Sequence, residues 1–214
     1  MQRRHFLQFS LGSLILGTLA ACGNDEPQLI AIPAGATVLA LGDSITYGYG
    51  ANPQTSYPAV LAQITGWNVI NAGVSGDTTE GALKRLPGLL QQYAPKLVLT
   101  SIGGNDFLRR VPEATTRSNL IAICRQIKDS GAQNMLIAVP KPSLVGASVG
   151  SLSDHPMYAE VAKEMNIPLQ KGGWADVLSD SSLRSDQIHA NARGYARFAE
   201  LLAVSLRETG LLKR

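Results

Sequence analysis

The sequence predicts an α/β protein, a three-layer α/β/α sandwich with a five-stranded parallel sheet at its centre. Short apolar runs alternate along the chain with longer segments of helical period, which is the pattern of strands covered by helices. Strands that follow one another through helices must run parallel and cross over right-handedly. The chain of 214 residues, 45% hydrophobic and 16% charged, is long enough to bury a sizeable core and suits one globular domain.

The predicted strands and helices alternate in order from residue 37 onward. Each strand is a short apolar run, and the strands are 37–41, 67–71, 97–102, 134–139 and 167–169. Each helix is a longer segment with helical period, and the helices are 56–65, 78–93, 115–130, 156–165 and 191–209. The order of the strands across the sheet is left open.

An export signal is predicted at residues 1–21. Arg3 and Arg4 precede an apolar stretch that ends in small residues and is too short and too early for an ordinary spanning helix. Residues 19–22, Leu-Ala-Ala-Cys, resemble the lipobox of bacterial lipoproteins, in which cleavage before the cysteine leaves its thiol to carry a lipid. Residues 3–7 also resemble a twin-arginine export motif, so the choice of export route stays open.

Cys22 is therefore expected to be lipidated. Residues 22–35, which mix polar residues with proline, would form a tether to a single domain at residues 36–214. These features predict a lipoprotein of the bacterial cell envelope that faces the periplasm or the exterior and is held at the membrane by its lipid. The alternative is a plain signal peptide followed by a chance cysteine.

Charge and cysteine content restrict the possible partners. The 19 Lys and Arg and the 16 Asp and Glu are dispersed, and no basic run is interleaved with aromatic residues, so no nucleic-acid partner is expected. The other cysteine, Cys124, lies in an apolar stretch of helical period, which favours a buried thiol over a disulfide. A monomer is expected.

Four short blocks carry the residues best suited to chemistry. Three of them follow the first three predicted strands, and ligands of parallel sheets bind at the carboxyl ends of the strands. These blocks are Gly42-Asp43-Ser44, Asn71-Ala72-Gly73-Val74-Ser75-Gly76-Asp77 and Gly103-Gly104-Asn105-Asp106. In the fourth, at 186–189, an aspartate and a histidine three residues apart lie on one turn. The blocks therefore predict one site that combines a hydroxyl, amide donors and an acid–base pair.

In this order the four blocks resemble those of the SGNH (GDSL-like) hydrolases, over residues 38–202. The resemblance implies a flavodoxin-like sandwich and a serine hydrolase that requires no metal or other cofactor. The site residues that it implies are the triad Ser44, Asp186 and His189 and the oxyanion-hole donors Ser44, Gly76 and Asn105. Residues 74–78 look like the branch of bacterial thioesterase I/lysophospholipase L1 and arylesterases, which favours Gly76 over Gly73.

The proposed roles also have a physical basis. A serine hydroxyl is a poor nucleophile, so His189 would accept its proton during attack and return it to the leaving group, while Asp186 orients the ring. Activity should therefore rise with pH as His189 loses its proton. Alone, Ser44 could be a helix cap, Gly76 a turn residue and Asn105 part of an Asx turn. All the blocks together favour the catalytic interpretation.

Three neighbouring features are predicted to be structural. Asp43 and Asp77, beside the site, are expected to organise loops by hydrogen bonds. Asp154-His155, followed by proline, is expected to be a loop that leads into a helix, and Gly172-Gly173 a plain turn.

The resemblance implies hydrolysis of small acyl esters or thioesters of short to medium chain length, as in arylesterases or lysophospholipases. Residues 140–153 follow the fourth strand and are suited to line an apolar acyl groove, unless they form a mobile surface loop. Two alternatives stay open: a carbohydrate O-deacetylase that uses the same triad, and a non-catalytic lipoprotein that binds an envelope ligand.

Overall fold

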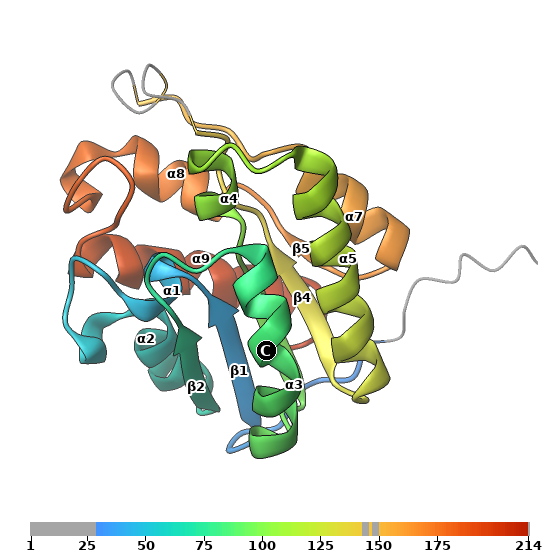
Figure 1. Cartoon of the computed structure of the whole chain (residues 1–214). Coiled ribbons are helices and arrows are strands. Elements are labelled where there is room, and N and C mark those ends of the chain that lie inside the picture. The colour runs from blue at the N-terminus through green and yellow to red at the C-terminus, as the bar shows by residue number, and fades with distance from the viewer. Residues whose placement is uncertain (1–28, 143–145, 147–149, 214) are drawn as a thin grey trace, which may run out of the picture.

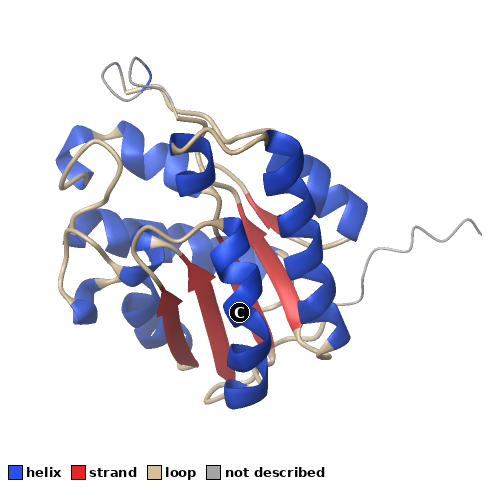
Figure 2. Cartoon of the chain, in the orientation of Figure 1, coloured by secondary structure: helices blue, strands red, loops and turns tan. Residues whose placement is uncertain are grey.

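The computed structural model describes residues 29–142, 146 and 150–213. The predicted export signal, Cys22 and the first part of the predicted tether lie outside these residues. In the described part of the chain, a five-stranded sheet lies between two layers of helices (Figures 1 and 2). This arrangement confirms the predicted α/β/α sandwich.

The sheet has the strand order β2-β1-β3-β4-β5, and all four neighbouring pairs are parallel. The strands are β1 (Thr37–Gly42), β2 (Asn68–Gly73), β3 (Leu97–Ser101), β4 (Gln133–Ile137) and β5 (Leu169–Gln170). The last strand is shorter and lies further along the chain than the predicted 167–169, because only two of its residues pair with the end of β4.

Five long helices confirm the five predicted ones: α2 (Tyr57–Thr65), α3 (Thr79–Tyr93), α5 (Glu113–Asp129), α7 (Met157–Met165) and α9 (Ala192–Glu208). Shorter helical segments were not predicted, because one or two turns are too short for a periodic pattern. They are α1 (Ser44–Tyr47), α4 (Gly104–Leu108), α8 (Gly173–Ser179) and the 3₁₀ turns Pro53–Thr55 and Ser181–Leu183. The prediction of a plain turn at Gly172-Gly173 is wrong, because the left-handed Gly172 leads directly into α8.

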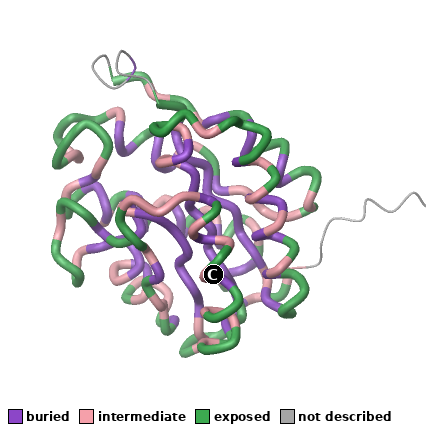
Figure 3. The backbone as a smooth tube through the Cα atoms, viewed as in Figure 1, coloured by how far each residue is buried: buried purple, intermediate pink, exposed green. Residues whose placement is uncertain are grey.

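Alternate residues of β1 pack against opposite layers, as the two-residue period of a strand requires. Val38 and Ala40 belong to the core under α2, α8 and α9, whereas Leu39 and Leu41 belong to the core under α3, α5 and α7. The buried backbone follows the sheet between these layers (Figure 3). Cys124 of α5 is buried and free, as predicted, and burial raises the pKa of its thiol to about 12.

The strand order creates a crevice at the carboxyl edge of the sheet. β1 lies beside β3, although β2 separates them in the chain. The crossover from β1 to β2 therefore runs in one direction across the sheet, and the crossover from β2 to β3 runs back past β1 in the other. Such a switch point is where ligands bind in open α/β sheets. Ser44 follows β1, and α4 follows β3, so two of the predicted blocks meet at this point. Among the described helices, none is long and apolar enough to cross a membrane.

Candidate active site

Ser44 is the first residue of α1, just beyond the end of β1. Asp43 caps this short helix, because its carboxylate accepts a hydrogen bond from Ile45 N at 3.1 Å. Burial, which outweighs this hydrogen bond and is reinforced by Asp77 and Asp106, raises the pKa of Asp43 to about 7. Asp43 thus has the loop-organising role predicted for it, and its cap holds Ser44 at the carboxyl edge of the sheet.

Asp186 and His189 lie in the loop before α9. His189 Nδ1 is 2.7 Å from Asp186 Oδ2, and His189 Nε2 is 2.9 Å from Ser44 Oγ. Because an ionised carboxylate only accepts hydrogen bonds, Nδ1 carries the proton and Nε2 is left to accept the Ser44 hydroxyl proton. The fold therefore joins the three residues predicted as a triad in one chain of hydrogen bonds.

The loop itself keeps Asp186 ionised. Asp186 Oδ1 accepts hydrogen bonds from the backbone N–H groups of Ile188 at 2.9 Å and His189 at 2.8 Å. Partial burial acts to raise the pKa of Asp186, but these bonds and the one from the His189 ring outweigh it, so the pKa lies below its ordinary value. Asp186 is therefore a carboxylate at neutral pH and fixes the orientation of the ring.

Tyr49 is a neighbour of His189 that was not predicted from the sequence. Its ring centroid lies 4.4 Å from that of His189, with the two planes tilted by 41°. The backbone carbonyl of Tyr49 accepts a hydrogen bond of 2.7 Å from the hydroxyl of Tyr195. Tyr49 follows α1 and His189 precedes α9, and no spacing in the sequence signals that these two segments meet.

Gly73 and Gly76 differ in how their backbones are used. Gly73 N donates to Asn71 Oδ1 at 3.0 Å, so its N–H is already engaged. Gly76 has φ 79°, in the left-handed region that favours glycine, and its carbonyl accepts a hydrogen bond of 2.8 Å from Arg109. This difference favours Gly76 over Gly73 as a backbone donor to a ligand.

Asn105 comes from α4 and faces the loop that carries Gly76. Its Nδ2 donates to the backbone carbonyl of Asp77 at 2.9 Å. A carboxamide nitrogen has two N–H groups, so one is left to point elsewhere. Ser44 and Asn105 line the same pocket, whereas Gly76 is not among the residues that line it. The Asn105 side chain is joined to the loop of Gly76 through the carbonyl of the neighbouring Asp77.

The pocket beside Ser44 has a volume of about 320 Å³. Its walls are mostly apolar side chains, with Lys141 as a cation among them; the apolar lining residues are Ile45, Leu108, Val139, Pro140, Pro142, Leu152, Leu178 and Ile188. Both ends of the predicted groove segment, 140–153, contribute to this wall. The residues between them at 143–145 and 147–149, which include the apolar Leu144, Val145 and Val149, lie outside the described residues.

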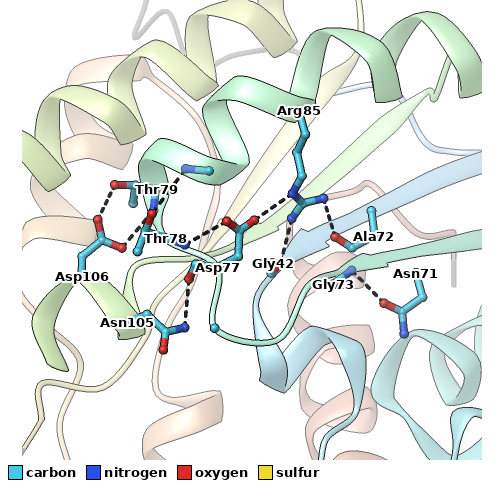
Figure 4. A network of polar contacts seen from close by, with 12 residues as sticks. Gly42, Asn71, Ala72, Gly73, Asp77, Thr78, Thr79, Arg85, Asn105 and Asp106 are labelled. Carbon is cyan, nitrogen blue, oxygen red and sulfur yellow. Dashed lines mark hydrogen bonds and ion pairs between the residues drawn. The ribbon is translucent and has the colours of Figure 1, made fainter. Parts of the chain in front are cut away.

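A polar network lies behind the pocket, and its contacts through Arg85 were not predicted (Figure 4). Arg85 of α3 donates to Asp77 Oδ2 at 2.8 Å, and it also donates to the carbonyls of Ala72 and Gly42. Asp77 Oδ1 accepts from the N–H of Thr78 at 3.0 Å, so Asp77 organises its loop as predicted. Arg85 could not be singled out from the sequence, because its partners lie up to 43 residues away.

The Asp154-His155 pair is structural, as predicted. Asp154 Oδ2 accepts a hydrogen bond from Gly172 N at 2.7 Å, and the His155 ring stacks on the Phe107 ring with the two centroids 4.3 Å apart. Both residues precede α7 and are not part of the pocket lining. In the residues that the structure describes, no group of three or more His, Cys, Asp or Glu is placed to hold a metal ion.

Known proteins with similar sequences are bacterial acyl hydrolases. The chain is 33% identical to thioesterase 1/protease 1/lysophospholipase L1 of Escherichia coli (strain K12) over 175 residues, which cover 79% of this chain and 83% of that protein. It is 32% identical to an arylesterase of Vibrio mimicus over 175 residues, which cover 79% of this chain and 87% of that one.

A solved structure of an esterase has the same fold. The psychrotrophic esterase EstA from Pseudoalteromonas sp., inhibited by monoethylphosphonate, superposes with a TM-score of 0.69 at 27% sequence identity. The match covers 81% of this chain and 97% of the esterase. The sequence profile described as the GDSL-like Lipase/Acylhydrolase family matches residues 40–197. The chain therefore belongs to the GDSL-like lipase/acylhydrolase family and is a serine hydrolase of the SGNH type.

Proposed function

We propose that this protein hydrolyses short to medium acyl esters or thioesters through an acyl-enzyme on Ser44, with His189 and Asp186 completing the triad. One observation carries the proposal, the continuous chain from Asp186 Oδ2 through the His189 ring to Ser44 Oγ, with links of 2.7 and 2.9 Å. The link between His189 and Ser44 lies within the range in which a base can take a proton from a nucleophile, and the link from Asp186 is a hydrogen bond that orients this base.

The reaction proceeds in two halves. Ser44 Oγ attacks the acyl carbon while its proton passes to His189 Nε2, and the tetrahedral oxyanion collapses as this proton is returned to the leaving alcohol or thiol. Water then attacks the acyl-enzyme and gives its proton to the same nitrogen, and Ser44 recovers a proton as the acid leaves. Asp186 stabilises the imidazolium that exists during each half.

The oxyanion is held by the N–H groups of Ser44 and Gly76 and by the free N–H of the Asn105 carboxamide. Ser44 and Asn105 already line one pocket, and Asn105 is tied to the loop of Gly76 through the carbonyl of Asp77. Removing one such donor costs about 10²–10³ in kcat in serine hydrolases.

The acyl chain occupies the apolar pocket beside Ser44. Its walls, formed by side chains such as Leu108, Leu152 and Leu178, suit a hydrocarbon chain, and a volume of about 320 Å³ suits one of short to medium length. The names of the similar proteins, a thioesterase/lysophospholipase and an arylesterase, support acyl esters and thioesters as the substrate class. Lysophospholipids and aryl esters are therefore the first substrates to compare.

The decisive experiment is hydrolysis of p-nitrophenyl acetate, butyrate and octanoate by the full chain in mild detergent. The parent protein should turn over these esters, and Ser44→Ala should lose at least about 10³-fold in kcat. Ser118→Ala, a change at an exposed serine of α5, is the matched control and should retain full activity. Activity that survives in Ser44→Ala would disprove the assignment of the nucleophile.

Two other outcomes identify the alternatives. A strict preference for acetylated sugars, such as acetyl-xylan, over p-nitrophenyl esters would indicate a carbohydrate O-deacetylase with the same triad. Turnover of neither class, together with no labelling of Ser44 by a fluorophosphonate, would indicate a lipoprotein that binds a ligand without catalysis.

We also propose that the chain is exported and carries a lipid on Cys22. The lipobox-like residues 19–22 and the apolar stretch before them support this proposal. A membrane-held hydrolase would meet acyl lipids at the surface of the bilayer, which is consistent with the proposed substrate class.

A further inference from the structure

Arg85 makes three hydrogen bonds behind the active site with a single guanidinium. Nε donates to Asp77 Oδ2 at 2.8 Å, one terminal nitrogen donates to the carbonyl of Ala72 at 2.7 Å, and the other donates to the carbonyl of Gly42 at 2.9 Å. Figure 4 shows the side chain reaching from α3 across the carboxyl ends of β1 and β2. A planar guanidinium can hold three acceptors in a fixed arrangement, which a single ammonium cannot reproduce.

Each acceptor belongs to a segment that supplies a proposed oxyanion donor. Gly42 ends β1, two residues before Ser44, and Ala72 lies near the end of β2, before the loop that carries Gly76. Asp77 directly follows Gly76. A single side chain on α3 therefore connects the backbone that delivers the nucleophile to the backbone of the oxyanion loop.

The third donor is tied to the same network. The carbonyl of Asp77 accepts the hydrogen bond from Asn105 Nδ2, while the Asp77 side chain pairs with Arg85. Asp77 therefore links the guanidinium to the carboxamide. The side chains of Arg85 and Asp77 are only 24% and 10% exposed, so solvent screens this ion pair less than a surface pair.

We propose that Arg85 is a positioning residue that fixes the oxyanion donors of Ser44, Gly76 and Asn105 relative to one another. The inference rests on the proposed function, because it assigns Arg85 a role in the same reaction. If Arg85 only fastened α3 to the sheet, replacing it would lower the stability of the protein and leave turnover by the folded protein unchanged. The two roles therefore differ in kcat and not only in the melting temperature.

The test compares Arg85→Ala and Arg85→Lys with the parent, with p-nitrophenyl butyrate as substrate. Because misplaced donors impair the transition state more than substrate binding, kcat should fall about 10²-fold in Arg85→Ala, with KM within about threefold of the parent. In Arg85→Lys, which keeps the charge but loses the fork of donors, kcat should fall by a smaller factor that still exceeds threefold. Arg117→Ala loses an ion pair to Glu164 between α5 and α7, and should retain the parent kcat as the matched control.

A second readout isolates the oxyanion site. Butylboronic acid forms a tetrahedral adduct with a serine hydroxyl and resembles the transition state, whereas butyrate resembles the ground-state product. In Arg85→Ala the affinity for the boronic acid should fall by about the same factor as kcat, while the affinity for butyrate should stay within about threefold. Equal losses for both ligands would contradict the positioning role.

The outcomes separate this inference from the proposed function. If the parent does not hydrolyse the ester, or Ser44→Ala does, the proposed function itself fails. If turnover depends on Ser44 and a folded Arg85→Ala stays within threefold of the parent kcat, only the role of Arg85 fails. If Arg85→Ala does not fold, Arg85→Lys is used instead. A kcat of Arg85→Lys within threefold of the parent would then overturn the inference.

Discussion

Ser44 can act as a nucleophile only if three conditions are met at the scale of single residues. The Asp43 cap holds it at the end of β1, His189 Nε2 lies within hydrogen-bond distance, and Asp186 fixes the tautomer of that ring. Ser44 was predicted because its short motif follows a recognisable strand, and Asp186 and His189 because their three-residue spacing places them on one turn. Tyr49 and Arg85 were not, because their contacts join segments that are distant in the sequence.

The first prediction concerns the pH dependence of turnover. Because the pKa of Asp186 is lowered, this group stays a carboxylate from mildly acidic to alkaline pH and keeps orienting the His189 ring, which acts as a base only when it is neutral. kcat/KM for p-nitrophenyl butyrate should therefore rise as the imidazole loses its proton and then level off. A rate that is independent of pH across this titration would contradict the role of His189.

The orienting role of Asp186 gives a second prediction. Asp186→Asn keeps the size of the side chain, but its amide can donate to Nδ1 and so favours the wrong tautomer of the ring. We expect kcat to fall by up to about 10⁴-fold with little change in melting temperature. Asp180→Asn, at an exposed aspartate before the same loop, is the control and should have nearly parent activity. Equal activity of the two variants would refute the role of Asp186.

A third prediction concerns Asp43 and stability. Its pKa is about 7 in the folded protein and near 3.8 when unfolded, so the folded state binds the proton more tightly between these values. The stability that Asp43 provides is complete below pH 4 and is lost as pH rises to 7, by up to about 4 kcal/mol at roughly 1.4 kcal/mol per pKa unit. Above pH 7 the loss is constant.

The variant Asp43→Asn isolates this effect because its amide does not titrate and can still accept from Ile45 N. In urea denaturation, the free energy of unfolding of Asp43→Asn minus that of the parent should increase from pH 4.5 to pH 7.5. The same difference for Asp129→Asn, at an exposed residue of α5, should stay flat. A flat difference for Asp43→Asn as well would rule out a raised pKa.

At the scale of elements, α8 and α9 flank the loop of Asp186 and His189 in the chain and pack together in one helix layer. Trp174 of α8 stacks on Phe198 of α9 with ring centroids 3.6 Å apart and planes 5° from parallel, and Tyr57 of α2 meets both rings edge-on. The long helix α9 was predicted from its apolar period. The short α8 was missed because seven residues are too few to show an apolar period, although its buried Trp174 is a principal contact between α8 and α9.

Truncation of this cluster gives a fourth prediction. Phe198→Ala removes a fully buried ring and should lower the free energy of unfolding by about 3–5 kcal/mol. Val204→Ala, on the same helix but 48% exposed, should change it by less than about 0.5 kcal/mol. Urea denaturation followed by tryptophan fluorescence measures both, and similar losses in the two variants would show that the aromatic cluster is not a main source of stability.

At the scale of the whole molecule, the sheet order determines where the chemistry lies. The alternation of strands and helices predicts a parallel sheet, but the position of β1 beside β3 depends on packing between distant residues and could not be read from the sequence. Once that order is known, the ends of β1 and β3 bring Ser44 and the α4 segment of Asn105 together. The four blocks could thus be predicted individually, and the pocket between them could not.

The proposed lipid anchor gives a fifth prediction at this scale. If Cys22 carries the lipid, the parent protein expressed in a bacterial host should fractionate with membranes and enter the detergent phase of Triton X-114. Cys22→Ser should move to the aqueous phase, because the lipid is lost with the thiol. Cys124→Ser, at a buried thiol, is the control and should fractionate like the parent. Identical fractionation of Cys22→Ser and the parent would argue against lipidation at Cys22.

Mass spectrometry after treatment with an ethyl fluorophosphonate decides whether Ser44 is the nucleophile of an acyl-transfer reaction. If it is, a single phosphonyl adduct should form on the peptide that contains Ser44, be absent from Ser44→Ala and form much more slowly in His189→Ala. An adduct on another residue, or no adduct in the folded parent protein, would show that Ser44 is not the nucleophile.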